Sequence, residues 1–171
     1  MYVGNLCARK NQKQLIESFV LMPTDLCEKT YICFLGGTQE SDDIKESINR
    51  SPYKNHFKIC GTIDKELVPQ YYEQGDAVVL ISQSEGFGLS LIEGMHFGLP
   101  CMTFTDVDAY EDIYSPDAVI GVEDHTNKAV AEGLQTLLTK EWNKNAIKAH
   151  SKKFESEEMA KRYIDFYMKY K

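Results

Sequence analysis

Short apolar runs alternate with amphipathic segments along most of the chain, and this alternation limits the folds that it can adopt. Apolar runs without polar alternation are typical of strands that are buried on both faces of a parallel sheet. Residues 1–6 have the composition of the end of one more strand. The order of segments predicts an α/β fold with a doubly wound, Rossmann-like parallel sheet of about six strands. The five internal runs are residues 31–37, 57–63, 77–82, 100–105 and 118–122.

The segments between these runs have the spacing and the end signals of helices. Residues 11–20 and 126–138 each place large apolar side chains on one helical stripe. Ser41 and Thr126 are candidate N-caps for the helices that follow them. Pro69 predicts that the helix between the second and third internal runs is short or kinked.

Residues 141–171 contain two further helical segments and no strand. The last segment begins with acidic residues and ends with lysines, which suits the helix dipole. Met159, Tyr163, Phe166 and Tyr170 recur in it at helical spacing. We expect this stripe to dock on the core, and the alternative is a surface for a domain outside this chain.

Composition excludes several classes of function. The net charge of −7 argues against a general nucleic-acid binder. No apolar run approaches the roughly 18–20 residues of a membrane span, and the N-terminus lacks the pattern of a signal peptide. The five cysteines are scattered and form no CxxC, which indicates a reducing, cytoplasmic compartment. The histidines and cysteines lack ligand spacing, so we expect no metal site.

The segment SEGFGLSLIEG, residues 84–94, raises a functional question because it places two acids around a Gly-Phe-Gly turn. It joins the expected strand 77–82 to a helix, and ligands of open α/β sheets bind at such junctions. Gly86 and Gly88 permit a tight turn and the close approach of a ligand. The amide groups that follow would face this ligand, and the positive end of the helix would favour a phosphate.

The two acids of this segment point to a ligand with hydroxyl groups. Glu93 lies one turn inside the helix, and helical side chains lean toward the N-terminus, so it can reach back to the turn. Glu85 approaches from the loop. Carboxylates are poor ligands for phosphate but good acceptors for hydroxyls. A polyol joined to phosphate, such as a nucleotide sugar, fits both features; the alternative is a capped, buried helix with incidental acids.

The stretch EGFGLSLIE resembles the E-x7-E motif of retaining glycosyltransferases of group 1 (family 4), which have the GT-B fold. The resemblance covers essentially the whole chain. YVGNLCARKNQKQLIESF resembles the family's first strand, phosphate loop and helix, and FLGG its second strand and turn. The stretch from ICGTID to GLPCMTF resembles the core of the donor-binding domain, and FESEEMAKRYIDFY the terminal crossover helix. The resemblance implies one nucleotide-sugar-binding domain over residues 1–171, with a core at 1–140 and helices at 141–171.

The resemblance also implies roles for individual residues. Glu85 would contact hydroxyls of the donor sugar, and Lys10 would neutralise the diphosphate leaving group; these two are the expected catalytic residues. Glu93 would accept hydrogen bonds from the ribose hydroxyls. The amides after Gly86 would hold the distal phosphate or the sugar, and the loop after the second internal strand would pack against the base. The residues expected to bind the donor are Gly4, Asn5, Arg9, Thr62, Ile63, Gly86, Phe87, Gly88, Leu89 and Glu93.

Two positions depart from the family's pattern. Asn5 stands where the family usually has arginine, so one positive charge toward the diphosphate is missing, and Arg9 is a candidate to replace it. Asp108 and Ala109 stand where the family often has a Gly-Gly pair. The donor-sugar contact at that second position is therefore in question.

The activity implied by the resemblance is transfer of a hexose from a nucleotide diphosphate sugar, UDP-sugar first, to an acceptor hydroxyl. It would proceed with retention and without a metal or further cofactor, and catalysis would rest on stabilising the departing diphosphate. Paired acids also serve retaining glycosidases, but the motif directs Glu93 toward the nucleotide, so we exclude that reading. The alternative is a non-catalytic relic of a donor domain, used for binding or assembly.

A GT-B enzyme binds its acceptor in a domain that precedes the donor domain. We therefore expect the acceptor half to be a missing N-terminal domain or a separate partner chain. Through that half the protein could associate peripherally with a membrane. The sequence does not identify the acceptor.

Overall fold

The computed structural model describes residues 1–38 and 41–169, and its strands are those that the apolar runs predict. All strand pairs are parallel, which confirms the expected α/β class. The strands are β1 (Tyr2–Val3), β2 (Ile32–Leu35), β3 (Phe57–Gly61), β4 (Val78–Leu80), β5 (Cys101–Phe104) and β6 (Val119–Val122).

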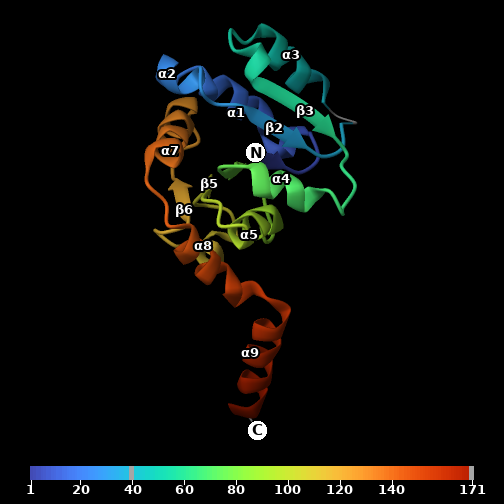
Figure 1. The fold of residues 1–171 in the computed structure, drawn as a ribbon, viewed down its shortest axis with the longest axis vertical. Coiled ribbons are helices and arrows are strands. Elements are labelled where there is room, and N and C mark those ends of the chain that lie inside the picture. Colours follow the sequence, from blue (N-terminus) through green and yellow to red (C-terminus); the bar gives the residue numbers. More distant parts are fainter. Residues whose placement is uncertain (39–40, 170–171) are drawn as a thin grey trace.

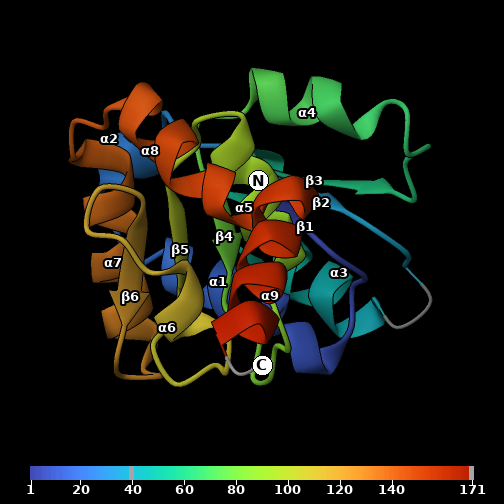
Figure 2. The ribbon, with the colours of Figure 1, turned by 90° about the horizontal axis from the view of Figure 1, so that it is seen from below.

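The strands form two three-stranded sheets that meet edge to edge. Their orders are β1-β2-β3 and β4-β5-β6. The N-terminal ammonium of Met1 donates to the carbonyl of Ala77 at 2.7 Å, and the Val79 amide donates to the carbonyl of Met1 at 2.9 Å. Figure 2 shows the strands side by side in the resulting order β3-β2-β1-β4-β5-β6. In such a sheet the chain leaves β1 and β4 in opposite directions, which opens a crevice at their carboxyl ends.

Helices cover both faces of the strands. α1 contacts α3 and α7, and α5 contacts β4 and α8; Figure 2 shows α4, α5 and α8 on one side of the strands and α1 and α3 on the other. The helices are α1 (Gln12–Phe19), α2 (Thr24–Cys27), α3 (Asp42–Arg50), α4 (Val68–Gln74), α5 (Leu89–His96), α6 (Tyr110–Ile113), α7 (Asn127–Thr139), α8 (Lys144–Ser151) and α9 (Ser156–Lys169), with 3-10 turns η1 (Ala8–Lys10), η2 (Lys54–His56) and η3 (Lys152–Phe154).

The helix signals in the sequence act as expected, with one exception. Thr126 caps α7 by accepting a hydrogen bond from the Ala129 amide at 3.2 Å, and Pro69 stands in the first turn of the short helix α4. Ser41 occupies the N-cap position of α3 but makes no capping bond. Its hydroxyl donates instead to the carbonyl of Thr38 at 2.7 Å.

The motif helix α5 packs unusually close to the sheet. A Cβ built on Gly94 would lie 2.4 Å from Cγ2 of Val78, on strand β4. Val78 is fully buried. Glycine at this position therefore sets how near the motif helix can come to the strand that precedes its loop.

The terminal helix α9 corrects one expectation. Figure 1 shows α9 projecting from the body of the domain. Tyr163 is 61% exposed and Phe166 is 58% exposed, whereas Met159 is half-buried; Tyr170 lies outside the described residues. The prediction that this stripe docks on the core is therefore wrong. Helical spacing identifies an apolar face but does not say what covers it.

Substituting Gly94 by alanine tests the close contact between α5 and β4. Alanine has the higher helix propensity, by about 1 kcal/mol, but overlap of its Cβ with Val78 forces overpacking that costs about 1–3 kcal/mol. We expect Gly94→Ala to lower the free energy of unfolding, measured by urea denaturation. Gly86→Ala is the control, since a Cβ there meets nothing within 4 Å. Equal stability of Gly94→Ala and the wild type would contradict this packing.

Candidate functional site

The loops after β1 and β4 come together at the carboxyl ends of these strands. The loop after β1 contains η1, and the loop after β4 contains the Gly-Phe-Gly turn. The amide of Gln83 donates to the carbonyl of Arg9 at 2.9 Å, which ties the two loops through their backbones. Side chains that are distant in sequence thus meet above the junction of the two sheets.

Lys10 and Glu85, the two residues expected to be catalytic, form an ion pair across these loops. The Lys10 ammonium donates to both carboxylate oxygens of Glu85, at 3.0 and 2.7 Å. Their side chains are only 12% and 16% exposed. Two charges so far removed from water persist because each satisfies the other with charge-assisted hydrogen bonds. The sequence prediction that these residues share one site is consistent with this contact.

Arg9 adds a second cation beside the same carboxylate. Its guanidinium Nη1 donates to the carbonyl of Ser84 at 2.8 Å and lies 4.0 Å from Oε2 of Glu85. The side chain is 56% exposed, so it remains open to a ligand. Two positive side chains therefore face one negative one, and the cluster of Arg9, Lys10 and Glu85 retains an excess positive charge.

A buried tyrosine holds the two loops in register. The hydroxyl of Tyr2 donates to the carbonyl of Lys10 and lies 3.3 Å from Oγ of Ser82, two positions after the end of β4. Burial raises the pKa of Tyr2 well above its ordinary value, so this hydroxyl stays a donor. Sequence reasoning missed Tyr2; its signal is a polar aromatic residue inside an apolar strand.

The backbone around Gly4 is crowded by the loop after β2. A Cβ on Gly36 would lie 2.2 Å from the carbonyl oxygen of Gly4, and a Cβ on Gly4 would lie 3.6 Å from Cε of Lys10. The amide of Gly37 donates to Oδ1 of Asn5 at 3.0 Å. Asn5 thus joins the two loops. Its side-chain oxygen links the loop after β1 to the loop after β2.

The start of α5 presents unbonded backbone donors. Gly88 is its N-cap in the left-handed conformation (φ 65°), which favours glycine. Within the described part of the chain, the amides of Phe87, Gly88 and Leu89 donate to no acceptor. These donors, the positive end of the helix dipole and the neighbouring cations make this end of α5 attractive to an anion.

The second acid of the motif has a different partner from the first. Glu93 is exposed, and its Oε2 accepts a hydrogen bond from the hydroxyl of Tyr72 at 2.8 Å. Tyr72 comes from α4 and is 2% exposed. The fold therefore holds Glu85 with a cation and Glu93 with a phenol. Tyr72 was also missed by sequence reasoning, because its contact with α5 depends on how two helices pack.

The remaining predicted positions stand apart from this cluster. Thr62 is exposed and Ile63 half-buried in the loop that follows β3. Across residues 1–38 and 41–169, no hydrogen bond or ion pair joins them to the other predicted site residues. Asp108 is exposed and Ala109 buried, immediately before α6. The roles of Thr62 and Ile63 stay predictions.

The motif loop also contacts the C-terminal segment. The ring of Phe87 meets the ring of Phe154 edge to face, with 6.0 Å between centroids. Phe154 ends η3, which leads into α9. A residue of the predicted site thus touches the segment from which α9 projects.

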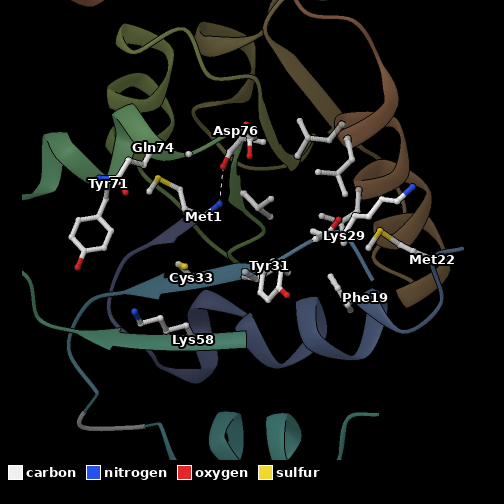
Figure 3. A pocket seen from close by; sticks show the side chains of 18 residues that line it. Met1, Phe19, Met22, Lys29, Tyr31, Cys33, Lys58, Tyr71, Gln74 and Asp76 are labelled. Carbon is white, nitrogen blue, oxygen red and sulfur yellow. Dashed lines mark hydrogen bonds between the residues drawn. The ribbon is translucent and has the colours of Figure 1, made fainter. Parts of the chain in front are cut away.

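A separate hollow of about 430 Å³ opens at the amino ends of the strands. Figure 3 shows Met1, Tyr31 and Cys33 among the side chains that line it. None of the predicted site residues lines it. The hollow lies at the opposite ends of the strands from the motif loop, so it forms no part of the site described above.

The described residues contain no group of three or more histidine, cysteine, aspartate or glutamate side chains that could hold a metal ion. None of the helices among them combines the length and apolar character needed to cross a bilayer. All five cysteines are free thiols.

Similarity to known proteins extends over nearly the whole chain. O-antigen chain mannosyltransferase B of Escherichia coli is 24% identical over 172 residues, which cover 98% of this chain and 45% of that protein. The chain thus spans about half the length of this relative. A 2-deoxystreptamine N-acetyl-D-glucosaminyltransferase of Niallia circulans is 27% identical over 154 residues, which cover 79% of this chain and 38% of that protein.

Solved structures show the same fold. The lipopolysaccharide outer core galactosyltransferase WaaB in its apo form has a TM-score of 0.83 and 16% identity over 99% of this chain and 48% of that one. Residues 1–154 match the family described as Glycosyl transferases group 1. This match includes both loops of the site and the α5 motif, and we conclude that the chain belongs to the group 1 glycosyl transferases.

Proposed function

We propose that this chain is the nucleotide-sugar-binding domain of a retaining glycosyltransferase that moves a hexose from a nucleotide diphosphate sugar to an acceptor hydroxyl. The observation that carries the proposal is the Lys10–Glu85 pair, 2.7 Å apart, beside the unbonded amides at the start of α5. UDP is the proposed carrier, since the similar Anabaena protein HepE (TM-score 0.71, 19% identity, 88% of this chain and 42% of that one) is described in complex with UDP.

In this proposal the positive groups of the site act on the diphosphate. The negative charge of the leaving diphosphate grows as its bond to the sugar breaks, and preorganised donors stabilise that charge. The ammonium of Lys10 has three donors and can serve Glu85 and a phosphate together. Arg9, which is exposed beside it, supplies the charge that Asn5 lacks. The mechanism assigns this role to protein groups rather than to a metal ion.

The two acids, Glu85 and Glu93, accept hydrogen bonds from the hydroxyl groups of the donor. Glu85, held at the mouth of the site by Lys10, accepts from hydroxyls of the sugar. Glu93, one turn after the start of α5, accepts hydrogen bonds from the ribose hydroxyls. Thr62 and Ile63 form the wall against the base. Together with the α5 amides, these contacts hold the donor from the base to the sugar.

The acceptor half is proposed to lie against the exposed face of α9. This α9 apolar face consists of Tyr163, Ile164, Phe166, Tyr167 and Met168, which are 58–70% exposed. An apolar face of this size at the end of a domain is typical of a surface that packs against another domain. We propose that the acceptor domain, in the same polypeptide or in a separate chain, covers it, in a reducing, cytoplasmic compartment consistent with the free thiols.

A second candidate function is a non-catalytic binding or assembly module. Asn5 favours it, because the residue at the family's arginine position is engaged with Gly37 instead of facing a ligand. The two candidates differ in nucleotide affinity. A module of this kind needs its α9 apolar face but no affinity for a nucleotide.

Calorimetric titration with UDP, GDP and ADP tests the donor site. We expect UDP to bind, and Glu93→Ala to weaken it by about tenfold or more, because hydrogen bonds to a charged group contribute about 1.5–3 kcal/mol. Glu132→Ala, at an exposed acid on α7, is the matched control and should bind like the wild type. Absence of binding of all three nucleotides at millimolar concentration would favour the assembly module.

Substitution of Lys10 by methionine tests its proposed contact with the diphosphate. Methionine keeps the length of the side chain but removes the charge, so affinity for UDP should fall about tenfold or more while affinity for uridine changes little. Lys13→Met, at an exposed lysine on α1, is the control. An equal loss of UDP and uridine binding would show that Lys10 supports the fold and not the phosphates.

A further inference from the structure

The hydroxyl of Tyr72 is a buried polar group whose strongest contact is with the proposed ribose acceptor. It lies 2.8 Å from Oε2 of Glu93 and 3.3 Å from the carbonyl of Ser90. The ring is stacked on Phe97 with 5.4 Å between centroids and 10° between planes, and it passes close to Gly94. Packing from both ends of α5 therefore fixes where this hydroxyl points.

Stability of the fold does not require the hydroxyl itself. A phenylalanine would keep the stacked ring and the burial, and it would avoid the cost of placing a polar group out of water. The oxygen is satisfied chiefly by a side chain that is exposed and would otherwise sample several rotamers. The main effect of this hydrogen bond is therefore to fix the orientation of the Glu93 carboxylate.

The bond leaves Glu93 ready for a ligand. Oε1 of Glu93 has no hydrogen-bond partner in the part of the chain that the structure describes, and Oε2 keeps a second acceptor position. A carboxylate held in one orientation before binding loses less conformational freedom when hydroxyls arrive. Burial, and then the carboxylate itself, raise the pKa of Tyr72 far above its ordinary value, so the hydroxyl donates throughout the usable pH range.

Tyr72 also connects two parts of the proposed donor site. It lies on α4, the helix that follows the loop of Thr62 and Ile63, whereas Glu93 lies on α5. A bond between these helices fixes the spacing between the base wall and the ribose acceptor. The distance between the contact for the base and the contact for the ribose would therefore be fixed before the nucleoside binds.

We propose that Tyr72 is a positioning residue, whose hydroxyl orients the Glu93 carboxylate toward the ribose hydroxyls of the nucleotide. This inference rests on the proposed function of the site. It assigns Tyr72 no contact with the donor, since it acts through Glu93.

The test compares UDP with 2′,3′-dideoxy-UDP, which lacks the hydroxyls that Glu93 would accept. In Tyr72→Phe, UDP affinity should fall about fivefold to twentyfold, while affinity for the dideoxy nucleotide should stay within about twofold of the wild type. In a Glu93→Ala background, Tyr72→Phe should have no further effect on UDP. Tyr31→Phe, at an exposed tyrosine away from the motif, is the matched control.

The ratio of the two affinities separates positioning from folding. A partly unfolded variant loses both ligands by the same factor, so its ratio equals that of the wild type. An equal loss of both nucleotides, or no loss of either, overturns the inference but leaves the donor site intact if Glu93→Ala still loses UDP. A wild type that binds no nucleotide overturns the proposed function and this inference together.

Discussion

The site depends on the pair of backbone hydrogen bonds that join β1 to β4. Met1 exchanges bonds with Ala77 and Val79, so the two sheets meet at this edge. Every residue of the charged cluster follows one of these two strands. Lys10 and Glu85 are 75 positions apart in sequence. They are in contact only because the strands that precede them are adjacent. The chemistry of the domain is in this sense a consequence of strand order.

Much of the fold could be predicted from local pattern. The six strands of the described chain and the helix cap at Thr126 depend on apolar spacing and on residue type at one position, which a single sequence displays. Glu85 was predictable from its place after a strand end, whereas Lys10 was identified only through the family resemblance; the two meet because both follow strands that are neighbours in the fold. The contacts of Tyr2 and Tyr72 were not, because they depend on which face of an element packs against another. The exposure of α9 was not predictable for the same reason.

Two glycines near the site allow neighbouring elements to approach closely, and a larger side chain does not fit at either position. Gly36 makes room for the carbonyl of Gly4, and Gly94 makes room for Val78. The first contact brings the loop of Lys10 toward the loop after β2, and the second brings α5 onto β4. Side chains at either glycine would move the charged groups apart even though neither glycine touches them.

The edge-to-face contact of Phe87 with Phe154 gives the C-terminal segment a mechanical link to the motif loop. η3 contacts that loop on one side and continues into α9 on the other. A domain that packs on α9 would therefore act, through this ring contact, on the turn that carries the free amides. Because such coupling is reciprocal, a ligand bound at the turn would act on α9 by the same route.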